Sequence, residues 1–346
     1  MKKIIGLVCV VLFLSGCYFN NTEVFLSPEG FHAADSPFTA GDHAISGIAN
    51  NGTAAVAVSN DGVIAYSPDS GVTWTRVAAE NIVDNFIDGI RFNAVTWGGG
   101  WFLAAGDEGR AAYSADGIHW QAGVIGPMSP KNIYCVAAGS VAGRTVFAAA
   151  GNDGRMAHAE DSPAGPWYMD DVSTFGSADY YAGNVYALAW GEIKGRGMFV
   201  AAGDRGKIAF LRDLSGKWYS NGRAGTGETF RSAAYGNDRF IAVGDNGLIK
   251  YSLDPLNSTW VTIKDSVFGL RYLNGIAFDP VINRFISYSD DTIVGLSEFG
   301  ESWNASNFQS RMAGGGANDP EKISAISCTA SRIILGGSRG TIAYSN

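Results

Sequence analysis

Two tyrosines and one arginine, Tyr134, Tyr186 and Arg231, are the residues of this chain whose types and positions could do chemistry. They occupy one equivalent place in successive copies of a repeat, where the other copies carry small polar residues. The complete set is Ser46, Asn93, Tyr134, Tyr186, Arg231, Asn274 and Ser324. Tyrosine and arginine are common anchors of binding surfaces, and arginine is rarely buried without a partner. The pattern therefore predicts a recognition surface rather than a reactive centre.

Four more residues lie in the segments that connect the repeats and could join this surface. They are Arg91, Arg271, Tyr180 and Tyr181. The same side chains also have a simpler interpretation, in which Arg231 pairs with an aspartate of a nearby turn and the two tyrosines fill a central channel. Both interpretations remain open at the level of the sequence.

Motifs for metal, cofactor or nucleophilic chemistry are not found in the sequence. The four histidines, His32, His43, His119 and His158, have no metal-ligand spacing. There is no Gly-x-Ser-x-Gly motif, and the two Gly-Gly-Gly runs at 98–100 and 314–316 lack the lysine of a phosphate-binding loop. We therefore expect no metal, no cofactor and no catalytic residue.

A turn rich in glycine and aspartate recurs along the chain and defines the repeat. Gly106-Asp107-Glu108-Gly109 is a clear copy, and glycines and an aspartate favour a tight turn at that place. Its seven copies end at Gly62, Gly109, Gly154, Gly206, Gly247, Thr292 and Gly340. The intervals of 47, 45, 52, 41, 45 and 48 residues between those positions are typical of propeller blades.

A tryptophan after a second turn recurs with the same period, but only six times. The copies are Trp74, Trp120, Trp167, Trp218, Trp260 and Trp303. The seventh repeat stops at Asn346 and so lacks its outer strand, and an open strand edge favours aggregation. We expect Thr22 to Leu26 to supply that strand. The sequence thus predicts an all-β, seven-bladed propeller of four-stranded antiparallel blades, closed by an N-terminal strand in the last blade.

Within each repeat the strands differ in character. The residue after the recognition position is small in every copy, as crowding at a propeller axis demands: Gly47, Ala94, Cys135, Ala187, Ser232, Gly275 and Ala325. The second strand is continuously apolar, as in 102–105 and 147–150, which indicates burial on both faces. The links between repeats vary most, and we call the side of the ring that carries them the variable-loop face. Loop variation on a rigid scaffold is where function usually lies.

The first residues form a targeting segment rather than part of the fold. Lys2-Lys3 precedes an apolar run from Ile4 to Leu14 that is short for a membrane span. Leu14-Ser15-Gly16-Cys17 resembles the lipobox of bacterial lipoproteins, which implies cleavage before Cys17 and acylation of its sulfur. We therefore expect a signal peptide at 1–16, a lipidated tether at 17–21 and one propeller domain at 22–346. Tyr18 in place of Asp implies outer-membrane sorting, on a periplasmic or surface-exposed face.

Composition limits the partners. The net charge of −8 argues against nucleic acid, because phosphate recognition needs a basic stripe. Beyond Cys9 and Cys17 only Cys135 and Cys328 remain, and they fall in repeats too far apart around the ring for a disulfide. We expect a monomer, held at the membrane by lipid, that binds a protein or an envelope glycan.

The segment from Ser67 to Trp74 resembles the Asp box, Ser-x-Asp-x-Gly-x-Thr-Trp, of BNR-repeat propellers. Ser114 to Trp120 matches with one residue fewer, and Ser297 to Trp303 has Phe299 where the aspartate should be. In that family the box is structural, with Ser and Asp bonding the turn backbone and Trp packing between strands. The rhythm of the whole repeat is similar to that of photosystem assembly-factor propellers, which implies a non-enzymatic scaffold that docks on partners.

Sialidases share the box and supply the alternative, a carbohydrate-binding or glycosidase-like propeller. Their Arg-Ile-Pro motif is missing from this sequence. Arg91, Arg231 and Arg271 could form an arginine triad near Tyr134 or Tyr186, and Trp97, Trp190, Tyr180 and Tyr181 could stack on sugars. The sequence favours a lipid-anchored scaffold that binds a macromolecular partner through its variable-loop face.

Overall fold

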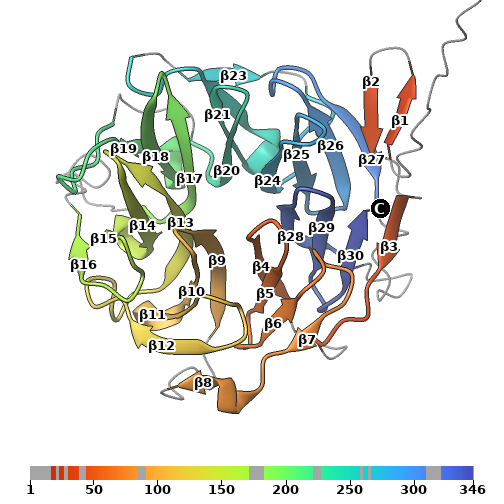
Figure 1. Ribbon diagram of the computed structural model, residues 1–346. Helices are drawn as coiled ribbons and strands as arrows, with labels where there is room; N and C mark the ends of the chain where they lie inside the picture. The colour runs from red at the N-terminus through yellow and green to blue at the C-terminus, as the bar shows by residue number, and fades with distance from the viewer. Residues whose placement is uncertain are drawn as a thin grey trace, which may run out of the picture.

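The computed structural model describes residues 17–20, 23–26, 30–38, 44–83, 91–170, 183–220, 227–257, 260–263, 266–308 and 321–345. These residues form a ring of seven antiparallel sheets around a central channel, and the inner strand of each sheet faces the axis (Figure 1). The predicted seven-bladed β-propeller is therefore confirmed.

Each blade runs outward from the axis in chain order. The first blade consists of β4 (Ile45–Asn50), β5 (Ala55–Ser59), β6 (Ile64–Ser67) and β7 (Thr75–Arg76). The second consists of β9 (Phe92–Gly98), β10 (Trp101–Gly106), β11 (Arg110–Ser114) and β12 (Trp120–Val124). The third consists of β13 (Ile133–Val141), β14 (Arg144–Gly151), β15 (Met156–Glu160) and β16 (Trp167–Met169). The fourth and fifth are β17 (Val185–Ile193), β18 (Arg196–Gly203) and β19 (Ile208–Leu211); and β20 (Phe230–Gly236), β21 (Arg239–Gly244), β22 (Ile249–Ser252) and β23 (Val261–Ile263). The last two are β24 (Leu273–Asp279), β25 (Arg284–Ser289), β26 (Ile293–Ser297) and β27 (Asn304–Asn307); and β28 (Ile323–Cys328), β29 (Ile333–Gly337), β30 (Ile342–Ser345) and β3 (Phe31–Ala33).

Two blades depart from the four-stranded plan. The second gains a fifth strand, β8 (Ile82–Val83), which follows the short 3-10 helix η2 (Ala79–Asn81) and pairs in parallel with β12. In the described part of the fourth blade, the outer strand is reduced to a single bridge, in which Phe210 and Tyr219 exchange backbone hydrogen bonds of 2.8 and 2.9 Å. Both changes lie at the outer rim, where the ring geometry constrains the chain least.

The N-terminal part of the chain closes the ring, but with a different segment from the one predicted. β3 pairs with β30 from Phe31↔Ser345 to Ala33↔Ala343, whereas β2 (Glu23–Leu26) pairs with β1 (Cys17–Asn20) in a separate hairpin beside β27 (Figure 1). The placement of 22–26 in the last blade is therefore wrong. Burial explains the choice, because Phe31 is 2% exposed and its ring packs edge-to-face on Phe308 at 5.1 Å between centroids.

The apolar second strands are buried between neighbouring blades, as predicted. The phenylalanines at equivalent places, Phe102, Phe147, Phe199, Phe240 and Phe285, are all 0% exposed. Burying a side chain of this size contributes about 1.5–3 kcal/mol to folding. Each of these rings belongs to an apolar cluster shared by two neighbouring blades, and these clusters hold the blades together.

The repeated turn between the second and third strands is a short 3-10 turn in four blades. The four are η3 (Asp107–Gly109), η4 (Asn152–Gly154), η5 (Asp204–Gly206) and η6 (Asp245–Gly247). The last glycine has a left-handed φ, 75° at Gly109, as the sequence indicated. The first glycine is needed for a different reason, because a Cβ at Gly106 would lie 1.8 Å from the carbonyl oxygen of Arg91.

The second turn, at the opposite side of the ring, satisfies its own backbone. Asp69 accepts hydrogen bonds from the backbone N–H groups of Val72 and Thr73 at 3.1 and 2.8 Å. Ser67 Oγ accepts one from Gly71 at 2.8 Å, and the indole of Trp74 donates to the Gly71 carbonyl at 2.9 Å. We call this side the hairpin face, and its Ser and Asp residues hold the turn together.

The position of β3 predicts that two N-terminal truncations differ in stability. Removing residues 18–26 leaves the last blade intact and should change the free energy of unfolding little. Removing residues 18–34 takes away β3 and should lower it strongly, because the blade loses its outer strand. Phe31→Ala alone should cost about 3–5 kcal/mol. Urea unfolding followed by tryptophan fluorescence measures all three, and equal stability of the two truncations would contradict the assignment of β3.

Candidate functional site

A β-bulge in every inner strand positions the predicted recognition residues. In each blade the register slips by one residue near the start of the inner strand, and the residue left unpaired is the one that the sequence singled out. A bulged residue leaves the ladder and its side chain is re-aimed. These seven residues are Ser46, Asn93, Tyr134, Tyr186, Arg231, Asn274 and Ser324, and we call them the channel-mouth ring.

The channel-mouth ring surrounds a cavity of about 250 Å³ at the axis. All seven of its members line this cavity, together with the small residues that follow them, such as Gly47, Ala94 and Ala187. The ring residues lie second in their strands, directly after the links between blades, so the ring opens on the variable-loop face. The structure thus places these side chains at the channel mouth on the variable-loop face, where the repeat pattern predicted them.

Three of the small polar members tie neighbouring blades together. Ser46 Oγ donates to the Phe92 carbonyl at 2.5 Å, and Asn93 Nδ2 donates to the Ile133 carbonyl at 2.9 Å. Ser324 Oγ donates to the Ile45 carbonyl at 2.7 Å. Each bond ends on the first inner-strand residue of the next blade. These three side chains therefore help to hold neighbouring blades of the propeller together.

The two tyrosines form a stacked pair. Their ring centroids are 5.2 Å apart with planes inclined by 30°. The Tyr134 hydroxyl accepts a hydrogen bond from Asn152 Nδ2, and the Tyr186 hydroxyl accepts one from Asn184 Nδ2, both at 2.9 Å. Burial raises the pKa of Tyr186 above its ordinary value, so its phenol stays protonated at neutral pH. The pair presents a fixed aromatic surface with two hydroxyl groups at the channel mouth.

The arginines near the channel mouth have aspartate partners in the repeated turns. Arg231 Nε pairs with Asp245, and its guanidinium lies 5.4 Å from the centre of the Tyr272 ring. Arg271 Nε pairs with Asp291 at 2.6 Å. The simpler interpretation of the sequence, in which Arg231 pairs with an aspartate of a nearby turn, is thus correct on this point. Its side chain nevertheless stays 42% exposed, and the guanidinium remains accessible at the mouth.

The other described residues that the sequence suggested for a site are not among those that line the channel-mouth cavity. Arg91 is exposed and lies one residue before β9, where its backbone carbonyl accepts a hydrogen bond from the Asp107 N–H at 3.0 Å. Tyr180 and Tyr181 fall outside the described residues. Among the aromatics proposed for sugar stacking, Trp97 packs on Phe102 at 4.5 Å between centroids, and Trp190 donates to the Ser140 carbonyl at 2.9 Å. Both tryptophans are engaged in strand and blade packing.

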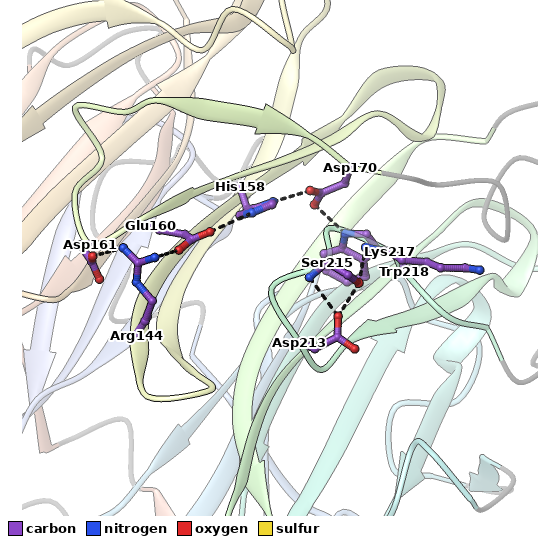
Figure 2. Close-up of polar contacts among 9 residues, drawn as sticks. All are labelled: Arg144, His158, Glu160, Asp161, Asp170, Asp213, Ser215, Lys217 and Trp218. Carbon is purple, nitrogen blue, oxygen red and sulfur yellow. Dashed lines mark hydrogen bonds and ion pairs between the residues drawn. The ribbon is translucent and has the colours of Figure 1, made fainter.

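A buried acid–base cluster joins the third and fourth blades and was not expected from the sequence. His158 Nδ1 lies 2.5 Å from Asp170 Oδ1, and the indole of Trp218 donates to Asp170 Oδ2 at 2.7 Å (Figure 2). The side chains of His158 and Asp170 are 5% and 0% exposed. One feature of the sequence could have indicated that Trp218 makes a different contact from the other repeated tryptophans. Trp218 follows Gly216 by two residues, whereas Trp74, Trp120 and Trp303 follow a glycine by three.

A second acid lies near the histidine, and its own partner is a surface arginine. Glu160 Oε1 is 3.9 Å from His158 Nε2, and Arg144 pairs with Glu160 and with Asp161 (Figure 2). The hydrogen bond to Asp170 raises the pKa of His158 above its ordinary value, although burial opposes the shift. The cluster is closed to solvent, so we interpret it as a junction between blades rather than a reactive centre.

Two further features concern metal-binding groups and membrane-spanning helices in the described residues. Within the described ranges, no group of three His, Cys, Asp or Glu side chains is arranged to hold a metal ion. No helix in the same part of the chain is long and apolar enough to cross a membrane.

The fold and the channel mouth define the class of this protein as a seven-bladed β-propeller. No protein-family model matches the chain, and no curated protein sequence matches it significantly. Solved structures do resemble it. YCF48 from Cyanidioschyzon merolae is 16% identical with a TM-score of 0.65, over 91% of this chain and 98% of that chain.

Two further structures show the same likeness. YCF48 bound to D1 peptide is 16% identical with a TM-score of 0.66, over 91% of this chain and 95% of that chain. The WD40 β-propeller domain of Doa1 is 12% identical with a TM-score of 0.63, over 91% and 96% of the two chains. At these identities the similarity establishes the architecture of this chain.

The His158 cluster predicts a pH-dependent stability. Since the folded pKa is raised above the unfolded value of about 6.5, the ion pair stabilises the fold fully below that value and is lost as pH rises through the folded pKa. The loss of unfolding free energy caused by His158→Gln should therefore be larger at pH 6 than at pH 9. Denaturant titrations at both pH values measure it. A penalty independent of pH would show that the imidazole is neutral in the folded protein.

Proposed function

We propose that this protein is a non-enzymatic scaffold, anchored by lipid in the bacterial cell envelope, that binds a macromolecular partner through its variable-loop face. The observation that carries the proposal is the stacked pair Tyr134 and Tyr186 at the channel mouth. Serine and asparagine suffice at equivalent positions to tie blades together. Two aromatic rings and an exposed guanidinium exceed that need, and they are the side chains that most often anchor interfaces.

The acids around the mouth support binding rather than catalysis. Asp107 accepts a hydrogen bond from Asn93 at 3.0 Å, and Asp204 accepts one from the Asn184 backbone at 2.8 Å. Asp245 pairs with Arg231. Each carboxylate thus has a positioning role within the turn that carries it. A glycosidase would instead need a pair of acids facing a common substrate.

A protein partner is the class that we favour. One structure with the same architecture is YCF48 bound to D1 peptide, so a propeller of this shape accommodates a peptide. The glycan alternative depends on exposed stacking aromatics, and Trp97 and Trp190 are engaged in packing. A monomer held at the membrane by Cys17 would present the variable-loop face to such a partner.

The binding proposal predicts the effect of the double variant Tyr186→Ala and Arg231→Ala. A photo-cross-linking residue at Asn274 should capture the partner in intact cells, and the double variant should reduce that yield at least about tenfold. The melting temperature should fall by only a few degrees, because Arg231 is half exposed.

A matched control removes the same residue types elsewhere. Tyr168 is 49% exposed on β16 and Arg196 is exposed at the start of β18. The variant Tyr168→Ala and Arg196→Ala should leave cross-linking unchanged. Normal cross-linking by the Tyr186 and Arg231 variant, together with a large loss of stability, would show that the channel-mouth ring is structural.

The anchor proposal predicts that Cys17→Ser releases the protein from membranes or blocks its processing. Acylated protein should fractionate with membranes and gain the mass of its acyl chains, because two or more chains give stable anchoring. Fractionation and intact mass spectrometry measure both properties. A Cys17→Ser variant that stays in the membrane fraction with normal processing would contradict the assignment.

A further inference from the structure

The link between the fifth and sixth blades exposes apolar side chains on the variable-loop face. Leu270 is 82% exposed, the most of any large hydrophobic residue in the described part of the chain. Val267 and Tyr272 in the same link are 47% and 44% exposed. Exposed apolar groups that gather in this way commonly mark an interaction site.

The backbone of this link is held firmly, so the exposure of Leu270 is built into the fold. Phe268 is 0% exposed and packs edge-to-face on Trp303 at 5.6 Å between centroids. The Gly247 N–H donates to the Arg271 carbonyl at 2.7 Å, and the Gly269 N–H donates to the Ser266 carbonyl at 3.1 Å. With both flanks fixed, Leu270 is presented to solvent without the entropy cost of ordering a loop on binding.

A pocket of about 430 Å³ lies beside Leu270. The turn η6, the strand β23 and the link enclose it, and its lining is Glu228, Asp245, Asn246, Gly247, Leu248, Thr262, Ile263, Ser266, Gly269 and Leu270. The lining thus combines an aliphatic part with two carboxylates, and no lysine or arginine is among these residues. We call it the link pocket.

The two carboxylates differ in how far their charge is already balanced. Asp245 forms an ion pair with Arg231. Glu228 interacts electrostatically with Lys250, but that lysine is 4% exposed, and burial lowers its pKa below the ordinary value. Lys250 therefore adds little positive charge to the pocket surface, and the described lining residues carry the two carboxylates and no cationic side chain.

We propose that the link pocket binds the side chain of an arginine or lysine from an extended segment of the partner protein, with an apolar neighbour of that residue resting on Leu270. This inference deepens the proposed function and rests on it, since it specifies the partner chemistry at the variable-loop face. Long basic side chains bury their stems against apolar groups and keep the charged end in a polar setting. Leu248, Ile263 and Leu270 suit the stem, and Glu228 suits the cation.

The overall charge of the protein agrees with a basic partner. A net charge of −8 attracts cationic segments over a distance and raises their rate of encounter. Arginine has a further advantage, because its planar fork can donate two hydrogen bonds to one carboxylate. Arginine is therefore the better probe for the test.

The test uses two synthetic peptides and the soluble Cys17→Ser chain. Acetyl-Ala-Leu-Arg-Ala-amide should bind about five- to tenfold more tightly than the same peptide with norleucine in place of arginine, as expected for a charge-assisted hydrogen bond. Heteronuclear NMR titration measures both affinities and reports which backbone amides shift. The expected shifts lie in η6 and at 266–272.

Variants separate the two halves of the proposal. Glu228→Gln should abolish the preference for arginine, and Leu270→Ser should weaken both peptides alike while keeping the preference. Glu192→Gln, which removes an exposed acid from the hairpin face, is the matched control and should change nothing. Equal affinity for the two peptides, or a preference that survives Glu228→Gln, would overturn the inference.

Failure of this inference can be told from failure of the proposed function. The peptide experiment needs neither the lipid anchor nor the natural partner. If the arginine preference is missing while cross-linking at the channel mouth still depends on Tyr186 and Arg231, the scaffold function stands and the link pocket is not its basic subsite. If the preference is present but cross-linking does not depend on the mouth, the partner surface is centred on the link.

Discussion

The inner strands of the seven blades must approach one another closely around one axis, and most of the structure follows from this constraint. A Cβ at Gly47 would lie 3.0 Å from the backbone nitrogen of Val95 in the next blade. Within the sixth blade, a Cβ at Gly275 would lie 2.2 Å from the ring of Tyr288 on the adjacent strand. Small residues at this position are therefore a steric requirement. The bulge one residue earlier has the complementary effect, because it turns one larger side chain per blade away from the ladder and towards the channel.

The constraint also explains why structural and candidate binding residues share one ring. The bulged residues Ser46, Asn93 and Ser324 each reach the first inner-strand carbonyl of the next blade. Tyr134 and Tyr186 cannot repeat that contact, and they stack on each other instead, with Asn152 and Asn184 holding their hydroxyl groups. The same backbone geometry thus supports two uses, and the size of the side chain decides between them.

Junctions between blades away from the axis are more varied. The third and fourth blades share an apolar cluster and are also joined by the polar contacts of His158, Asp170 and Trp218. Near the rim the blades spread apart, so there is room for ionisable groups that satisfy one another. The rim also accommodates the extra strand β8 and the reduced outer strand of the fourth blade. Variation of this kind leaves the axis and the channel mouth unchanged.

Repetition in the sequence was sufficient to predict the architecture. Seven turns at intervals of 41 to 52 residues, six tryptophans and a small residue in every inner strand specify seven blades. The channel-mouth ring was also predictable, because equivalent positions in a cyclic repeat face the same axis. The sequence by itself determined these features since each is set by local strand and turn chemistry repeated seven times.

Contacts between segments far apart in the chain were decided only by the tertiary structure. Phe31 rather than 22–26 closes the last blade, because its ring fills a site against Phe308 that no local pattern reveals. Arg231 and Arg271 meet aspartates of the repeated turns, and Trp218 finds Asp170 in the preceding blade. The exposure of Leu270 follows from the burial of Phe268 two residues earlier. Each of these depends on how blades and links pack in three dimensions, since the chain's local preferences leave such pairings undetermined.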